Sequence, residues 1–153
     1  MTSINPGHMR MAQDAARRSN CIRRAVGAII VRDDLVLATG WNGVSAAYRD
    51  CGEAGCLRCL EGGSTGSGYD QCMCIHAEQR AIADAAARGV ATKNSVLYVN
   101  LRPCLQCLNL VSAARVRGVV FDEDWAYSPQ LEGSYQAIAA KFEFFEALAV
   151  PVG

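Results

Sequence analysis

His76-Ala77-Glu78 lies at the middle of the chain, and Pro103-Cys104-Leu105-Gln106-Cys107 follows it farther on. An imidazole nitrogen and thiolates are donors that zinc prefers, and a catalytic zinc site takes three protein ligands while one position stays open for water. His76, Cys104 and Cys107 are three such ligands. The two stretches therefore predict a zinc site that binds and activates water.

Glu78 has a position that suits a different task from metal binding. Glu78 lies two residues past His76 at a helix start. From there its carboxyl can reach a water at the site but cannot easily bind the metal that His76 binds. It would move protons between that water and a bound substrate. Pro103 suits a helix entry, where the dipole favours thiolate over thiol in the nearby cysteines. The alternative, a structural zinc site, would need a fourth ligand and gives Glu78 no role.

The composition of the whole chain narrows the class of protein. Its 153 residues suit one domain with a single core, so we expect one domain over residues 1–153. A formal net charge of zero argues against binding of duplex nucleic acid, which needs a basic surface. We find no apolar run of membrane-spanning length and no export signal in the sequence. We therefore expect a cytoplasmic protein without a membrane partner, whose eight cysteines are metal ligands rather than disulfides.

Hydrophobic periodicity divides the chain into alternating helices and strands, which predicts a layered α/β domain. Helices are expected over residues 9–19, 76–88, 104–114 and 132–148, and strands over residues 25–31, 35–39, 95–100 and 119–121. Residues 40–70 have little periodicity and include a run rich in glycine and serine, which is typical of a long loop. Cysteines in and beside this loop indicate a metal-clipped, cysteine-rich insert over about residues 44–74.

The pattern H-x-E followed by P-C-x-x-C is the signature of zinc deaminases that act on nucleobases. At these residues the chain resembles the cytidine/deoxycytidylate deaminase superfamily, most closely its deoxycytidylate (dCMP) deaminase branch. The likeness covers roughly residues 9–125. Further matching stretches are Arg10-Met11-Ala12, the run from Arg18 to Ala28, Thr39-Gly40-Trp41-Asn42-Gly43, the run from Cys51 to Arg58, Cys72 before His76-Ala77-Glu78-Gln79, and Leu97-Tyr98-Val99.

This resemblance implies a three-layer α/β/α domain with a five-stranded mixed sheet, and a homo-oligomer, either a dimer or a hexamer. It implies a zinc-dependent hydrolase that acts on the C–N bond of a cyclic amidine and deaminates a cytosine nucleotide, in first place dCMP, to dUMP and ammonia. Another cytosine nucleotide, a modified cytosine or a free base stays open as the substrate. A non-catalytic zinc-bound interaction module also stays open, although such a module would not require Glu78.

The other cysteines resemble a second, structural zinc site of some dCMP deaminases. In this resemblance the ligands are Cys21, Cys51, Cys56 and Cys72. Four thiolates would close a tetrahedral site and tie the insert to the first helix. Cys59 and Cys74 are further candidates, because they form C-x-x-C and C-x-C pairs with Cys56 and Cys72. We expect two zinc ions per chain, one catalytic and one structural, and the choice among the six cysteines stays open.

Two residues are expected to contact the substrate. Asn42 resembles the family's substrate-binding asparagine at the end of the second strand. Arg80 stands where the branch usually has asparagine, and a guanidinium beside the pocket would pair with a phosphate; the alternative is a solvent-facing or interface residue. Charge alone adds further phosphate candidates, which are Arg23, Arg24, Arg49 and Arg102.

Overall fold

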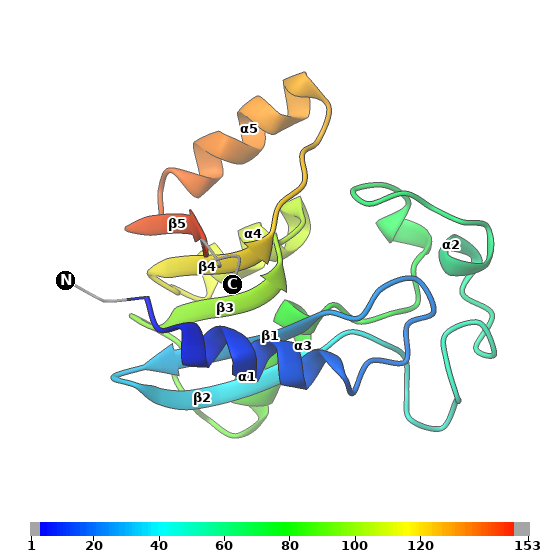
Figure 1. Cartoon of the computed structure of the whole chain (residues 1–153), viewed down its shortest axis with the longest axis horizontal. Coiled ribbons are helices and arrows are strands. Elements are labelled where there is room, and N and C mark those ends of the chain that lie inside the picture. The colour runs from blue at the N-terminus through cyan, green and yellow to red at the C-terminus, as the bar shows by residue number, and fades with distance from the viewer. Residues whose placement is uncertain (1–3, 149–153) are drawn as a thin grey trace, which may run out of the picture.

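The computed structural model describes residues 4–148, in which five strands form one mixed sheet with helices on both faces (Figure 1). The strands are β1 (Gly27–Arg32), β2 (Leu35–Trp41), β3 (Val96–Leu101), β4 (Gly118–Glu123) and β5 (Phe144–Ala147). Their order is β2-β1-β3-β4-β5. β1 is antiparallel to both of its neighbours, whereas β3, β4 and β5 run parallel. The predicted five-stranded mixed sheet is therefore confirmed.

The helices are α1 (Pro6–Ala16), α2 (Leu57–Leu60), α3 (Ala77–Ala87), α4 (Leu105–Ala113) and α5 (Pro129–Ala139), with a 3-10 turn, η1, at Tyr69–Gln71. Successive strand residues point to opposite faces of the sheet. On β1, Ile29 packs in a cluster with α1, while Ala28 and Ile30 pack in the cluster that α3, α4 and α5 share. The predicted three layers follow from this alternation, with α1 in front of the sheet in Figure 1. Within residues 4–148 no helix is long and apolar enough to span a bilayer.

The last part of the chain corrects one sequence prediction. The spacing of its apolar residues predicts a helix over residues 132–148, but α5 ends at Ala139 and Phe144–Ala147 forms β5. β5 pairs with β4, and the ring of Phe144 lies over Gly118, where a Cβ would come within 2.1 Å of it. Phe145 packs on Phe121 with ring centroids 5.0 Å apart. These tertiary contacts decide the structure, because a short segment with two aromatic residues suits a strand at least as well as a helix.

The cysteine-rich insert, residues 44–74, leaves the domain between β2 and α3 and contains α2 and η1. Gly43 and Ile75 close its base through two backbone hydrogen bonds of 3.0 and 2.9 Å. Asn20, which follows α1, accepts hydrogen bonds from the backbone N–H groups of Val44 at 2.8 Å and Cys51 at 2.9 Å. In Figure 1 the insert extends to the right of the sheet, where α2 is labelled. The insert is therefore tied to the segment between α1 and β1.

Candidate active site

The two halves of the zinc motif meet at the N-terminal ends of α3 and α4. His76 immediately precedes α3, Cys104 immediately precedes α4, and Cys107 lies in the first turn of α4. His76 Nδ1 lies 3.5 Å from Cys104 Sγ and 3.4 Å from Cys107 Sγ. A nitrogen and a sulfur on one tetrahedral zinc are about 3.6 Å apart. The three donor atoms, all within 4.8 Å of one another, therefore fit one zinc ion.

Close packing at Gly40 positions the start of α3. A Cβ on Gly40 would lie 2.1 Å from the carbonyl oxygen of Ala77, so the helix rests directly on the backbone of β2. The His76 N–H donates to Gln79 Oε1 at 2.8 Å, which caps the first turn. The His76 ring meets the ring of Tyr69 from η1 edge to face, with centroids 4.8 Å apart. Gly40 in β2 and Tyr69 of the insert together set the position of His76, a candidate metal ligand.

Aromatic residues after β4 hold the loop that contains Pro103 and leads into α4. The Tyr135 hydroxyl donates to the Pro103 carbonyl at 2.6 Å, the Leu105 N–H donates to the Tyr127 hydroxyl at 2.8 Å, and the Trp125 indole N–H donates to the Arg102 carbonyl at 2.8 Å. Tyr135 is fully buried, so these bonds are anchored in the core. The loop therefore presents Cys104 from a rigid support.

Glu78 is buried beside the ligand set, with 4% of its surface exposed. Burial, followed by the negative charge of Cys104, raises the pKa of its carboxyl from 4.5 to about 7. A carboxyl with this pKa is able both to accept and to release a proton near neutral pH. Its position is therefore that of an acid–base group next to the three donors.

A sulfur–sulfur hydrogen bond moves the pKa values of the two thiols of the motif in opposite directions. A hydrogen bond with Cys107, and then one with His76, lower the pKa of Cys104 to about 4. The same sulfur–sulfur hydrogen bond, followed by burial, raises the pKa of Cys107. A soft divalent cation binds such a set by displacing thiol protons, because thiolate is the form that ligates. The donor chemistry therefore also fits zinc.

A cavity of about 250 Å³ adjoins the three donors and is lined by His76, Glu78, Cys104 and Asn42. The arginines in its wall are Arg23, Arg24, Arg58 and Arg102. Arg24 is paired with Glu123, and Arg102 is paired with Asp124 and Glu132.

Arg23 and Arg58 have different partners. Within the described residues, Arg23 donates to the carbonyl of Gly63, and Arg58 donates to the carbonyls of Ser64 and Ser67. A carbonyl does not neutralise a guanidinium as a carboxylate does, so the wall attracts an anion. Of the four arginines predicted from charge, Arg49 does not line the cavity. Arg58 was missed, although its position between Cys56 and Cys59 is a signal that could have found it.

Asn42 and Arg80, the two predicted substrate residues, differ in where they lie. Asn42 lines the cavity, but its Oδ1 accepts from the Val26 N–H at 2.8 Å and its Nδ2 donates to the Arg24 carbonyl at 2.7 Å. One N–H and one lone pair of the amide remain for a ligand. Arg80 is not among the cavity-lining residues; its Nε donates to the Trp41 carbonyl at 2.8 Å. It supports the end of β2 from behind.

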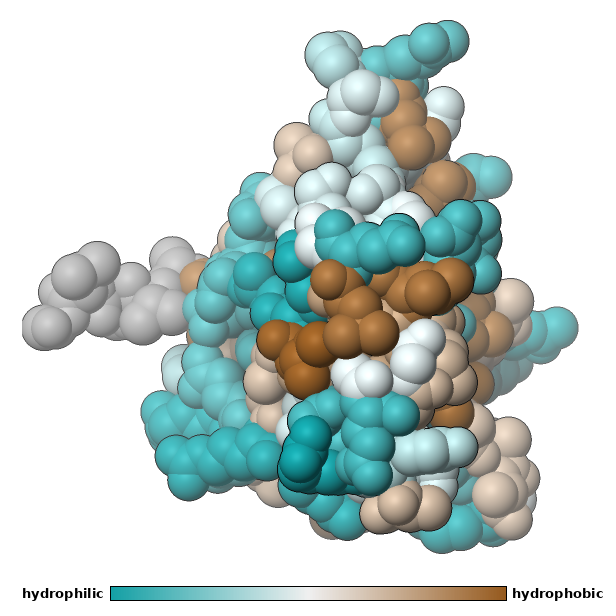
Figure 2. Space-filling model, turned by 90° about the vertical axis from the view of Figure 1, so that its right-hand side faces the viewer, coloured by the Kyte–Doolittle hydropathy of each residue, from teal (hydrophilic) through white to brown (hydrophobic). Residues whose placement is uncertain are grey.

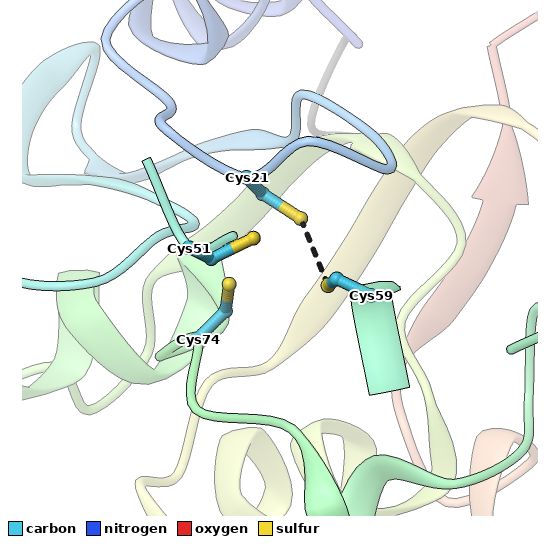
Figure 3. A group of neighbouring side chains, drawn as sticks. All are labelled: Cys21, Cys51, Cys59 and Cys74. Atoms are coloured by element: carbon cyan, nitrogen blue, oxygen red, sulfur yellow. Dashed lines mark hydrogen bonds between the residues drawn. The ribbon is translucent and has the colours of Figure 1, made fainter. Parts of the chain in front are cut away.

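The six other cysteines gather beside the cavity, but the four predicted ligands do not form one group. Cys21 and Cys51 lie together with Cys59 and Cys74, whose side chains point toward one another in Figure 3. A second group consists of Cys56, Cys59, Cys72 and Cys74. Within each group all sulfurs lie within 4.8 Å of one another. The predicted set is thus divided between two groups that share Cys59 and Cys74.

Comparison with known proteins bears on this geometry. Residues 3–123 match the family model of the cytidine and deoxycytidylate deaminase zinc-binding region. The chain belongs to this family. It is 41% identical to the deoxycytidylate deaminase of Schizosaccharomyces pombe over 113 residues, which cover 74% of this chain and 35% of that protein. It is 36% identical to the deoxycytidylate deaminase of Mycobacterium phage D29 over 119 residues, which cover 74% of this chain and 90% of that protein. The predicted resemblance is confirmed.

The lengths and folds of the relatives add two facts. The chain spans about a third of the length of the two yeast deoxycytidylate deaminases that it matches, from S. pombe and Saccharomyces cerevisiae. The dCMP deaminase of the cyanophage S-TIM5, solved in complex with dCMP and dUMP, has a TM-score of 0.69 and 22% identity over 95% of this chain and 100% of that chain. The phage protein therefore shares this α/β/α fold.

Proposed function

We propose that the chain catalyses the zinc-dependent hydrolytic deamination of a cytosine nucleotide, with dCMP converted to dUMP and ammonia. The observation that supports this most directly is the buried Glu78, which adjoins three zinc donors at a cavity walled by arginines. Zinc held by His76, Cys104 and Cys107 supplies a water activated near neutral pH when it is bound. The remaining chemistry is proton transfer and positioning, which the side chains perform.

Glu78 moves the protons of the reaction. Its carboxylate accepts a proton as the water oxygen bonds to C4 of the base, and it returns that proton to ring nitrogen N3. It then accepts the proton of the new hydroxyl and gives it to the amino group, so that the C4–N bond breaks, ammonia leaves and the C4 carbonyl forms. A pKa of about 7 suits both directions of transfer. Protons balance without any other acid.

The arginines of the wall favour a phosphorylated substrate over a nucleoside. Arg23 and Arg58, which donate to carbonyls, are the phosphate ligands in this proposal. Asn42 holds the sugar or the base edge through the half of its amide that Arg24 and Val26 leave free. Arg80 acts as a positioning residue, because it holds the carbonyl of Trp41 next to Asn42.

Structural zinc in the insert and self-association complete the proposal. The two cysteine groups supply zinc ligands that tie the insert to the domain. None of the eight cysteines forms a disulfide, which suits the reducing cytoplasm. Figure 2 shows hydrophobic residues grouped on the face from which the insert projects. Exposed hydrophobic side chains of the insert and its neighbours are Ile22, Tyr48, Leu57, Leu60, Met73 and Ile75. A homo-oligomer, either a dimer or a hexamer, would cover such a surface. Light scattering coupled to gel filtration measures the mass of the assembly and so tests this.

A substrate panel tests the activity. The zinc-loaded protein is assayed for ammonia release from dCMP, CMP, deoxycytidine, cytidine, cytosine and 5-methyl-dCMP, with dAMP as a purine control. We expect dCMP to have the highest kcat/KM and deoxycytidine to be a much poorer substrate. A folded, zinc-loaded protein that releases ammonia from none of the cytosine compounds would reject the proposal. A preference for a nucleoside or for the free base would move the activity to the alternative substrates.

A further inference from the structure

The two cysteine groups of the insert share two of their members. Cys59 and Cys74 belong to both groups, Cys21 and Cys51 belong to the first, and Cys56 and Cys72 belong to the second. The four side chains of the first group come from four separate segments and converge on one point in Figure 3. The six sulfurs are therefore one continuous cluster rather than one tetrahedral site with two spare thiols beside it.

We propose that this cluster binds two zinc ions, which share the thiolates of Cys59 and Cys74 as bridging ligands. Two four-coordinate ions require eight donor positions, and six cysteines fill them only if two sulfurs bridge. The shared pair is the pair that the two groups have in common. Cys21 and Cys51 complete the first ion, and Cys56 and Cys72 complete the second.

The sulfur separations suit tetrahedral zinc on both sides of the cluster. Two sulfurs on one tetrahedral zinc, each about 2.3 Å from it, lie about 3.8 Å apart. Cys21 Sγ lies 3.8 Å from Cys59 Sγ in the first group. Cys56 Sγ lies 4.0 Å from Cys72 Sγ in the second group. Each half of the cluster therefore has a pair at the separation that its own ion requires.

Backbone amides support a terminal ligand in each half. The Ile22 N–H donates to Cys51 Sγ at 3.3 Å, and the Met73 N–H donates to Cys56 Sγ at 3.4 Å. Hydrogen bonds of this kind orient a metal ligand and stabilise negative charge on its sulfur. The same arrangement at Cys51 and at Cys56 indicates that both halves are built to hold thiolates.

The packing of the insert gives the cluster a structural purpose. The buried core of the insert consists of Val44 with four cysteines, which are Cys51, Cys56, Cys59 and Cys74. This core buries little apolar surface, so the hydrophobic effect contributes little to the folding free energy of the insert. The binding energy of structural zinc contributes to that folding free energy directly. Cys74 precedes His76 by two residues, and Cys21, Cys72 and Cys74 line the active-site cavity. Two ions would thus fix the insert and the entry into α3 together.

Zinc counting by mass spectrometry distinguishes this cluster from a single structural site. The wild-type chain should contain three zinc ions, two in the cluster and one at His76, and the Cys56→Ser/Cys72→Ser variant should contain two. A single structural ion on Cys21, Cys51, Cys59 and Cys74 would instead give a total of two zinc ions per chain in both proteins. One ion on the four cysteines predicted from the sequence would give two in the wild type and one in the variant. Either of these results overturns the proposal.

The Cys104→Ser/Cys107→Ser variant isolates the cluster from the catalytic centre. It should keep two zinc ions, and X-ray absorption should detect only sulfur neighbours and a second zinc at about 3 Å, the separation that two shared thiolates impose. Two ions without zinc–zinc scattering would reject the bridges, and one ion would reject the cluster. These readouts do not depend on turnover, so a failure of the deaminase proposal leaves them unchanged. If the Cys56/Cys72 variant does not fold, the wild-type count and the scattering still decide.

Discussion

Replacing Gly40 with alanine should displace the catalytic end of α3. The new Cβ would lie 2.1 Å from the carbonyl oxygen of Ala77 and 2.5 Å from the backbone nitrogen of Ala81. Ordinary van der Waals contact begins at 3.4 Å, and both atoms belong to a helix backbone that cannot rotate away. The helix must therefore move outward by more than about 1 Å, and His76 and Glu78 would move with it.

The expected losses in stability and in kcat/KM follow from that displacement. Overpacking of this kind destabilises a domain by about 1–3 kcal/mol. A misplacement of about 1 Å in a catalytic group lowers the rate about 10²-fold. We therefore expect Gly40→Ala to fold with reduced stability to urea and to deaminate dCMP with kcat/KM about 10²-fold below wild type, measured as ammonia release per zinc-loaded chain.

Gly27→Ala is the matched control on the opposite face of the sheet. A Cβ there would lie 2.0 Å from the Ala12 carbonyl oxygen and 2.4 Å from the Ala16 nitrogen, both in α1. α1 contains no residue that lines the cavity. Gly27→Ala should lose similar stability and keep kcat/KM within a few-fold of wild type. Native activity in folded Gly40→Ala, or an equal loss in both variants, would refute the reasoning.

Three further predictions concern the arginines and the acid stability. Arg58→Gln should lower kcat/KM for dCMP about tenfold or more and leave kcat/KM for deoxycytidine unchanged, because a charged hydrogen bond to phosphate contributes about 1.5–3 kcal/mol. Arg49→Gln, at an exposed residue outside the cavity, is the control. Equal losses on both substrates would contradict the phosphate role of Arg58. Arg80→Asn should lower kcat/KM similarly for dCMP and deoxycytidine, and a loss confined to dCMP would make Arg80 a phosphate ligand instead. The Arg102 guanidinium lowers the pKa of Glu132 to about 2, so the pair stabilises the fold above the unfolded pKa near 4.5, and this stabilisation is lost as pH falls toward 2. Glu132→Gln should therefore cost about 1–2 kcal/mol at pH 7 and progressively less below pH 4.5 in urea unfolding, and a cost independent of pH would contradict the assignment.

Local spacing predicted from the sequence that the residues of the candidate site come together. His76 and Glu78 are two residues apart at a helix start, and Cys104 and Cys107 share one helical turn, so each pair has its geometry set within a few residues. The short continuous apolar runs of β1, β3 and β4 predicted the central strands in the same way. Features of this kind can be predicted without knowing which distant segments are in contact.

Contacts between distant segments decided the rest. Phe144 forms a strand because Gly118 leaves room for its ring, and helical spacing contains no sign of that partner. The six cysteines of the insert could be grouped in many ways from sequence, and only their positions in space give Cys59 and Cys74 to both groups. The periodicity of the insert does not indicate that Arg58 reaches the cavity, and only its place between Cys56 and Cys59 points to it.

Ammonia release from dCMP by the zinc-loaded Glu78→Gln variant, measured beside its zinc content, tests the central claim most directly. Glutamine keeps the size of the side chain but cannot transfer protons in the same way, and Glu78 is not one of the three donors. We predict that the variant folds, keeps the zinc content of the wild type and deaminates dCMP at least about 10²–10⁴-fold more slowly. Turnover within a few-fold of the wild type would contradict the assignment of Glu78 as the group that moves the protons.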